Sequence, residues 1–218
     1  MARLPVINHS GGVTLIEQLV SLLLGSVLIT SLYTYFRAEL YRTASVETKT
    51  GSLEDARGAM DIIIRDLMNA GSWQNGSPPL ETGAADDPDQ DSDDVCNRVY
   101  AASPSTIHIQ MDLNGNGNCA DLDPRENIRY ELANPTATCP GPQIIRRNGD
   151  CLVANVVPGL PGKVFTYYDA SGADLGANPA RDAIKRVKIS FGVQVKNPDP
   201  NGSGNLTSTV LSSVEFRN

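Results

Sequence analysis

The sequence lacks the patterns by which several common classes of enzyme are identified. Only two of its 218 residues are histidines, His9 and His108, and His9 precedes the long apolar run that begins at Val13. It contains no HExxH pair, phosphate-binding loop or nucleophile elbow. No pair of carboxylates has the setting of an acid–base couple. His108, alone on a predicted strand, is typical of a surface residue. We therefore do not expect an enzyme.

A basic surface is also missing, because the net charge is −7. The excess of acidic over basic residues comes from one stretch that contains seven acidic residues and no basic one: Glu81, Asp86, Asp87, Asp89, Asp91, Asp93 and Asp94. The 25 acidic residues less these seven equal the 18 basic ones. The acidity is therefore the property of one solvated loop, and no nucleic-acid partner is expected.

The four cysteines, Cys96, Cys119, Cys139 and Cys151, show no CxxC spacing, which argues against a zinc site. All four follow the apolar run described next, and an even number there suits two disulfides in an oxidising compartment. Three pairings are possible, of which we favour Cys96–Cys119 with Cys139–Cys151. Four reduced, buried thiols are the alternative.

A long apolar run extends from Val13 to Phe36, and Glu17 is its only charged residue. As a helix it would be roughly 36 Å long, enough for the ~30 Å hydrocarbon core of a membrane. A secretory signal peptide carries its small residues after the apolar core. Here Gly11 and Gly12 precede it, so cleavage after Gly12 would remove a short leader and retain the membrane helix.

The hexapeptide Gly12-Val13-Thr14-Leu15-Ile16-Glu17 resembles the type IV prepilin signal, whose usual form has phenylalanine where this chain has Val13. The resemblance implies cleavage between Gly12 and Val13 by a prepilin peptidase and N-methylation of the new amino terminus. It also implies that Glu17, at the fifth mature position, sets the register between subunits.

The physical argument for Glu17 starts from the cost of an acid in a membrane helix, ~2.5–3.5 kcal/mol at the centre, which makes such a residue functional by default. Cleavage creates an amine on Val13, which can approach Glu17 of a neighbouring subunit in a weakly screening environment. Any other axial offset leaves both charges unpaired, so the pair selects register. The alternative is an ordinary signal anchor whose Glu17 reaches the interface.

The predicted organisation is a leader over residues 1–12, a transmembrane and filament-core helix over 13–40, and a globular head over 41–218. Within the head we expect a helix over 41–71, an acidic loop over 72–98 and a β-rich region over 99–218. One apolar stripe marks the helix: Leu53, Ala56, Met60, Ile63, Leu67 and Ala70. Gly51 is expected to interrupt it, with Ser52 as a new N-cap, and Gly71 to end it.

Beyond residue 98 the apolar period becomes two, which predicts strands. It covers Ile107–Met111, Ile128–Leu132, Val164–Tyr168, Val187–Val195 and Leu206–Phe216. Asn148-Gly149 between two apolar runs predicts a hairpin. The fold class is therefore α+β, with the long helix packed on a mostly antiparallel sheet in the layout of type IV pilins.

Two further segments, "ARGAMDIIIRDLMNAG" (56–71) and "SSVEFRN" (212–218), resemble PilW-like minor pilins and the J-type pseudopilins of type II secretion. The resemblance implies a minor pilin that primes or caps a type IV pilus near its tip. It implies contacts with other minor and major pilins through the N-terminal helix, with the prepilin peptidase, and with the inner-membrane assembly platform.

The same resemblance, together with the cysteines, places the chain in the inner membrane. It would be a single-pass protein with its head in the periplasm, in contact with lipid before assembly and later part of an extracellular pilus. A minor pseudopilin of type II secretion is the alternative within this class. A calcium-dependent adhesin or binding module, displayed on the membrane or at the tip, is the alternative of another class.

Residues 112–123, "DLNGNGNCADLD", have the ligand spacing of an EF-hand-type calcium loop. Six residues are candidate ligands or nearby oxygen donors: Asp112, Asn114, Asn116, Asn118, Asp121 and Asp123. Gly117 stands where the turn is sharpest, and Asp123 at the twelfth place resembles the dockerin variant. Neutral residues at the third and fifth places predict a weak structural Ca²⁺ site, and an ion-free Asn/Gly turn is the alternative. No organic cofactor is expected.

Overall fold

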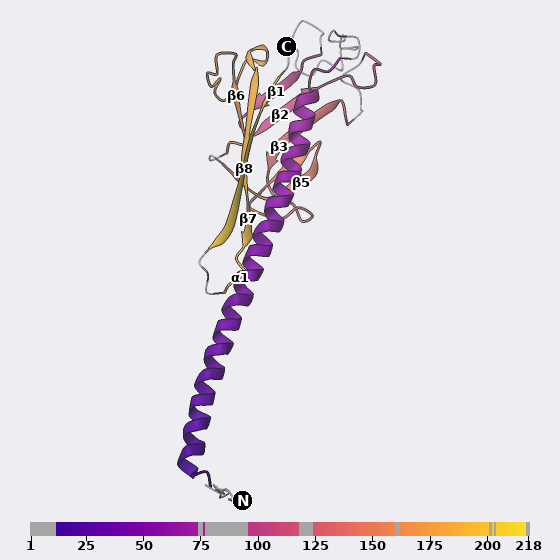
Figure 1. The fold of residues 1–218 in the computed structure, drawn as a ribbon. Coiled ribbons are helices and arrows are strands. Elements are labelled where there is room, and N and C mark those ends of the chain that lie inside the picture. Colours follow the sequence, from indigo (N-terminus) through magenta and orange to yellow (C-terminus); the bar gives the residue numbers. More distant parts are fainter. Residues whose placement is uncertain are drawn as a thin grey trace, which may run out of the picture. The chain divides into compact units, whose positions relative to one another are not determined.

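The computed structural model describes residues 12–73, 76, 96–117, 124–159, 162–200, 202 and 204–216 (Figure 1). The chain divides into two compact units, residues 1–46 and 47–218, and each is described by itself. One helix, α1 (Leu15–Asn69), contributes its first part to one unit and its second part to the other. Residues 47–218, called the head below, also contain the strands β1 (Val99–Ser103), β2 (Thr106–Gln110), β3 (Asn127–Ala133), β4 (Gln143–Arg147), β5 (Asp150–Pro158), β6 (Phe165–Tyr168), β7 (Arg186–Lys196) and β8 (Asn205–Glu215), and the short 3₁₀-helix η1 (Arg181–Ala183).

Helix α1 runs without a break through Gly51, so the expected interruption and new N-cap are wrong. The Ser52 hydroxyl donates to the carbonyl of Lys49, 3.0 Å away, as a mid-helix serine does. Glycine costs a helix interior about 1 kcal/mol relative to alanine, and packing of the residues after it outweighs that cost. The helix ends at Asn69, and Gly71 follows at φ +74°, as predicted for its stop.

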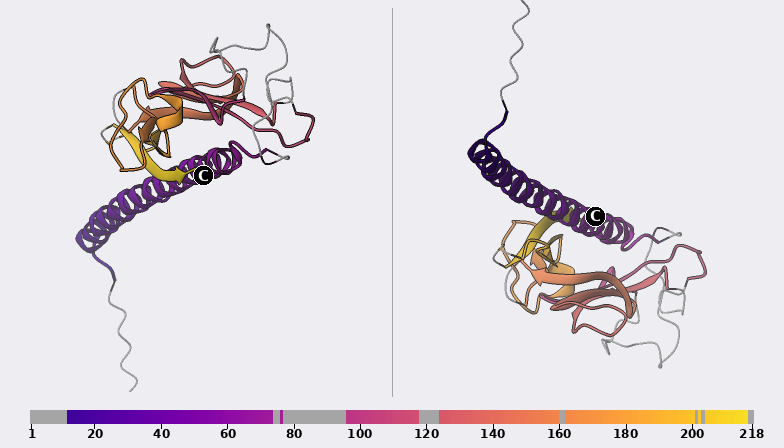
Figure 2. Two further views of the ribbon diagram at one scale, coloured as in Figure 1. Left: turned by 90° about the horizontal axis from the view of Figure 1, so that it is seen from above. Right: turned by 90° about the horizontal axis from the view of Figure 1, so that it is seen from below.

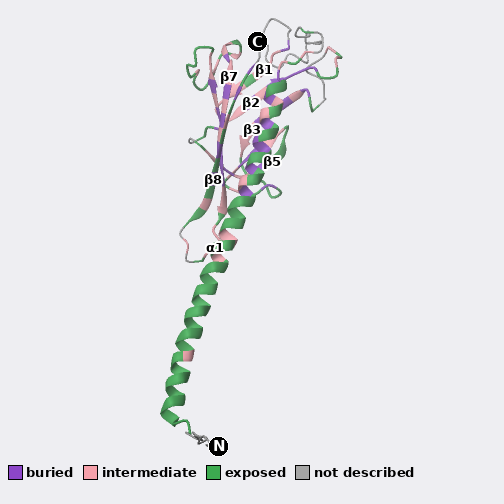
Figure 3. Ribbon diagram, viewed as in Figure 1, coloured by how far each residue is buried: buried purple, intermediate pink, exposed green. Residues whose placement is uncertain are grey.

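The apolar stripe predicted on the helix is confirmed within the head. Ala56, Met60, Ile63, Leu67 and Ala70 are buried, and Leu53 is partly buried against the same core. Ala59 and Ser52 are buried as well, so the contact face is wider than the stripe. Figure 3 shows this alternation of buried and exposed turns along the second part of α1.

The strands form one antiparallel sheet in the order β1-β2-β3-β4-β5-β7, which confirms the predicted α+β class in its coarse form. Strand β7 is central, since β5 and β6 pair with successive stretches of it and β8 pairs along all of it. Seen from above and from below, the sheet arches across one side of the second part of α1 (Figure 2). The helix therefore covers one face of the sheet, and the core lies between them.

The predicted hairpin joins β4 to β5 through Asn148 and Gly149, both at positive φ, 51° and 89°. That pair of dihedrals is the one that two-residue hairpin turns require and that the Asn-Gly sequence favours. The Asn148 side chain adds a second function, because its Nδ2 donates to the carbonyls of Pro124 and Asn127, at 2.9 and 3.1 Å. The turn thus also holds the segment that enters β3.

Cys139 and Cys151 form a disulfide, with their Cα atoms 6.1 Å apart, which matches the pairing favoured from the sequence. It connects the loop before β4 to β5. Cys96 is disulfide-bonded too. The expected partner, Cys119, lies outside the described residues, as does the acidic run 81–94.

Candidate functional site

The first part of α1 presents its apolar side chains to the outside on all its faces (Figure 3). Large apolar residues that a soluble protein buries are exposed here: Val13, Leu15, Ile16, Leu19, Val20, Leu22, Leu23, Leu24, Val27, Leu28, Ile29, Leu32, Tyr33, Tyr35 and Phe36. By length and composition the helix is long and apolar enough to cross a membrane. A large exposed apolar surface of this kind marks a site of contact with a membrane or with other apolar surfaces.

Four hydroxyl groups in this stretch bond to backbone carbonyls of the helix itself. Ser26 donates to the carbonyl of Leu23 and Thr30 to that of Ser26, each at 2.8 Å. Ser31 and Thr34 bond in the same way, to the carbonyls of residues 27 and 31. Polar groups in hydrocarbon need internal partners because no water is available there. These serines and threonines are therefore compatible with an apolar surrounding.

Glu17 has a second role, at the start of the helix, that was not among the predictions from the sequence. Helix α1 begins at Leu15, and the Thr14 Oγ1 atom accepts the backbone N–H of Glu17 at 3.3 Å. Thr14 is thus the N-cap and Glu17 the third helical residue, which is the Thr-x-x-Glu spacing of the capping box, with the Thr14 half of the box formed. A carboxylate in the first turn is also favoured by the helix dipole.

Gly12 and Val13, the residues on either side of the predicted cleavage bond, lie outside the helix and are exposed. A Cβ atom added at Gly12 would meet no other atom of the chain within 4 Å. The bond between them is therefore accessible to an enzyme, and the start of α1 at Leu15 rather than Val13 keeps it in irregular backbone.

The loop after β2 brings together the described half of the predicted calcium ligands. Asp112 is 3 % exposed, and its two carboxylate oxygens accept the N–H groups of Gly115 and Gly117, at 2.7 and 3.2 Å. Asn114 Oδ1 accepts the N–H of Asn116 at 2.8 Å. Asn118, Asp121 and Asp123 lie outside the described residues. Asp112, Asn114 and Asn116 therefore belong to one tight turn, and the cation remains a prediction.

Glu126, just before β3, braces this turn and was not among the predicted residues. It is fully buried, and its Oε1 accepts the N–H groups of Leu113 and Asn114, at 2.9 and 2.7 Å. Its Oε2 accepts the Asn114 side-chain amide at 3.0 Å. The ligand spacing of calcium loops does not include Glu126. This residue contacts the loop only because β3 runs antiparallel beside β2 and so brings Glu126 back to the end of β2. Within the described part of the chain, no three His, Cys, Asp or Glu residues cluster as a metal site.

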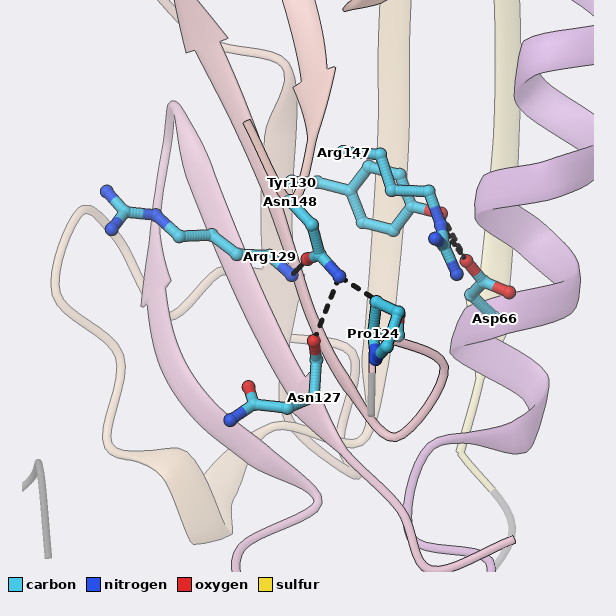
Figure 4. Close-up of polar contacts among 7 residues, drawn as sticks. All are labelled: Asp66, Pro124, Asn127, Arg129, Tyr130, Arg147 and Asn148. Atoms are coloured by element: carbon cyan, nitrogen blue, oxygen red, sulfur yellow. Dashed lines mark hydrogen bonds and ion pairs between the residues drawn. The ribbon is translucent and has the colours of Figure 1, made fainter. Parts of the chain in front are cut away.

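A second polar cluster lies within the head, between α1 and the sheet (Figure 4). Arg147 Nε on β4 lies 2.9 Å from Asp66 Oδ2 on α1, and the Tyr130 hydroxyl on β3 donates to the same oxygen. Burial, followed by the hydrogen bond to Asp66, raises the pKa of Tyr130. Burial alone lowers the pKa of Arg147, but Asp66 and Tyr130 together outweigh burial, so the pKa is raised. The cluster joins the helix to two strands.

His108 lies on β2 on the face opposite Ile107 and Ile109, which are both buried. Its Nε2 contacts Asn127 Oδ1 on β3, and its ring lies edge-on to Tyr100, with the centroids 4.5 Å apart. Burial lowers the pKa of His108. His108 is therefore a half-buried residue on the face of the sheet opposite the core, packed against Tyr100 and Asn127.

Comparisons with protein-family models, with curated proteins and with solved structures found no match.

Proposed function

We propose that this protein is a minor pilin of a type IV pilus, a structural subunit that primes or caps assembly near the tip after removal of residues 1–12. One observation carries the proposal: the large apolar side chains of α1 from Leu15 to Phe36 are exposed, whereas the head has a complete core of its own. Such a helix is suited first to lipid and then to the helices of neighbouring subunits.

The register mechanism uses the two charges at the start of the mature chain. Cleavage after Gly12 leaves an amine on Val13, four residues before Glu17. In a bundle of apolar helices this amine pairs with Glu17 of the next subunit, since each charge would otherwise be buried without a partner. The pair therefore favours one axial offset between neighbours, while apolar contact along Leu15–Phe36 supplies the attraction.

The partners in this proposal are other minor and major pilins, the prepilin peptidase, the inner-membrane assembly platform and, before assembly, lipid. The head would stand in the periplasm and later outside the cell, where its Cys139–Cys151 bond is stable. A type II secretion pseudopilin would use the same helix in the same way. Deletion of the gene separates the two, because pili disappear in one case and secreted proteins in the other.

The amino-terminal sequence and intact mass of the protein purified from membranes test the proposal. We expect a chain that begins at Val13 with one added methyl group. Gly12→Val should keep the leader attached, whereas Gly58→Ala, a glycine substitution far from the bond with no steric conflict, should be processed normally. A mature chain that retains residues 1–12 in the unaltered protein would refute the prepilin assignment.

A further inference from the structure

Three strands of the described head pair with one other strand only, and they differ in what lies beside them. Helix η1 packs against β1, and β6 has an isolated bridge between Tyr168 and Asp174. Strand β8 pairs with β7 alone in the described part of the head. An uncovered edge offers a row of N–H and C=O groups to another strand.

The register shows which groups of β8 point outward. The backbone groups of Ser190 on β7 point away from β8, because the Ser190 N–H donates to the carbonyl of Val164 and the Ser190 carbonyl accepts the N–H of Gly159. Leu211, directly across from Ser190, therefore has no ladder bond to β7, and its backbone groups point away from the sheet. By the two-residue period, the same holds for Thr207, Thr209 and Ser213.

Strand β8 lacks the features that usually prevent strand addition. Its eleven pairs with β7 follow one another without a bulge, and residues 205–215 contain no proline, lysine or arginine. Glu215, at its end, is its only charged residue. Leu211 is 62 % exposed at the middle of the strand. Natural edges of this length are normally blunted by charge, proline or twist, so this one is suited to pairing.

A groove of about 350 Å³ runs along the same edge, between β8 and the second part of α1. Its β8 side consists of residues 209–212, and its helix side includes the apolar Leu53, Met60 and Ile64. Arg57 and Asp61, of opposite charge, line the same groove. Figure 1 shows β8 beside this part of the helix. The side chains of an added strand would therefore reach apolar surface on the helix side.

We propose that β8 accepts an extended, uncharged strand from another polypeptide, which continues the sheet and fills the groove with its alternate apolar side chains. Backbone donors and acceptors repeating every two residues are complementary to an extended chain and to no small ligand. The inference rests on the proposed function in one respect: a different subunit of the assembly supplies the strand.

The strand comes from a different subunit for a geometric reason. Pairing of β8 with β8 of a second copy across a two-fold axis would run antiparallel. It would reverse the direction of the accompanying α1 in that copy, whereas subunits anchored in one membrane share a direction. A free peptide has no such constraint. The segment 205–215 can pair with β8 about Val210, which places Leu206 opposite Val214 and leaves no like charges opposite each other.

The test uses the full chain in detergent micelles and a synthetic peptide of residues 205–215, with amide hydrogen exchange as the readout. Without peptide, the outward amides of Thr207, Thr209, Leu211 and Ser213 should exchange fast, and those of Ser208, Val210 and Ser212 slowly. Peptide at about 1 mM should slow the outward amides by about tenfold. Outward amides that are already slow without peptide, or that peptide leaves unchanged, would overturn the proposal.

Thr209→Pro removes an outward N–H and spares the bonds to β7, so it should abolish the protection by peptide. Thr209→Val, the matched control, keeps the N–H and should retain it. Equal protection in the two variants would also contradict the proposal. Should the proline variant fail to fold, a second pair of variants makes the same comparison without removing an N–H group. Leu211→Lys should reduce the protection by peptide, and Leu211→Thr, its control, should retain it. None of these readouts depends on leader removal, so they fail independently of the proposed function.

Discussion

Arg147 on β4 and Asp66 on α1 form an ion pair, with Nε 2.9 Å from Oδ2, although the two residues are far apart in the sequence. Their side chains are only 28 % and 15 % exposed. The Tyr130 hydroxyl donates to the same carboxylate oxygen. These contacts make the head's part of α1 a component of the sheet domain, which has a measurable consequence.

Substitution of Asp66 should destabilise the head. We expect Asp66→Ala to lower the free energy of unfolding by about 1.5–3 kcal/mol, the range for hydrogen bonds to a charged group. In a double-mutant cycle with Arg147→Ala, monitored by chemical denaturation, the two losses should be less than additive. The Arg129–Glu131 pair, in which Arg129 is 57 % exposed, is the control and should contribute little. Additive losses at Asp66 and Arg147 would show that they do not interact.

Alkaline pH should destabilise the head through two tyrosines. Burial raises the pKa of Tyr130 and of Tyr167, so that both exceed the ordinary value near 10. Above that pH the unfolded chain releases these protons and the folded chain retains them, so the free energy of unfolding falls as pH rises. An absorbance titration should show two of the seven tyrosines ionising only with unfolding. Tyr167→Phe should reduce that number to one, and ionisation of all seven in the folded protein would contradict this.

Gly51 and Gly71 should respond in opposite directions to alanine. At Gly51 a Cβ meets nothing within 4 Å in a regular helix, so Gly51→Ala should add about 0.5–1 kcal/mol to stability. At Gly71, with φ +74°, a Cβ would lie 2.5 Å from Arg98 Nε. Gly71→Ala should therefore cost more than about 1 kcal/mol. Melting temperatures of the two variants check this, and a shift of the same sign in both would be inconsistent with it.

Substitutions at Thr14 and Glu17 should distinguish the effect of helix capping from the effect of the Glu17 charge on subunit register. Glu17→Gln keeps a capping-box side chain but removes the charge, so it should impair incorporation into filaments while membrane insertion continues. Thr14→Ala removes the cap, at a cost of about 1 kcal/mol to the helix end, but leaves the charge and should allow incorporation. Immunoblots of sheared filaments against membrane fractions measure both. Normal incorporation of Glu17→Gln would leave capping as the residue's only function.

Calcium should raise the melting temperature of the protein if residues 112–123 bind it, because a ligand that binds the folded state stabilises it by mass action. The expected shift is a few degrees at millimolar Ca²⁺, given a weak site. Asp112→Asn keeps one of the two side-chain oxygens that accept the N–H groups of Gly115 and Gly117, and it removes the negative charge, so it should abolish most of the shift. An equal shift in that variant, or none in the parent, would exclude this loop as a calcium site.

Much of the fold was predictable because the spacing of apolar residues along a helix or a strand depends only on neighbouring residues. The stripe from Ala56 to Ala70 and the alternation of Val187, Ile189, Phe191 and Val193 identify the faces that the structure buries. Asn148-Gly149 predicted its hairpin correctly. The candidate site was partly predictable in the same way, since the Thr-x-x-Glu spacing of Thr14 and Glu17 is also a local pattern.

Other features could not be read from spacing. Gly51 was expected to break the helix because its local cost is real, but packing of Leu53 to Leu67 on the sheet exceeds it. Glu126 reaches Leu113 and Asn114 only because β3 returns beside β2. The order of strands around β7 likewise depends on pairings between distant segments.

By itself, the sequence determined that the chain has an apolar amino-terminal helix with one acid in its first turn and a head of alternating strands, because helix and strand periods and caps depend on neighbouring residues. The tertiary structure alone decided which charges meet, as Asp66 and Arg147 do, and which strands pair on one side only among the described residues, as β8 does. Those outcomes depend on where the chain returns in space, and that is set by the sum of many contacts.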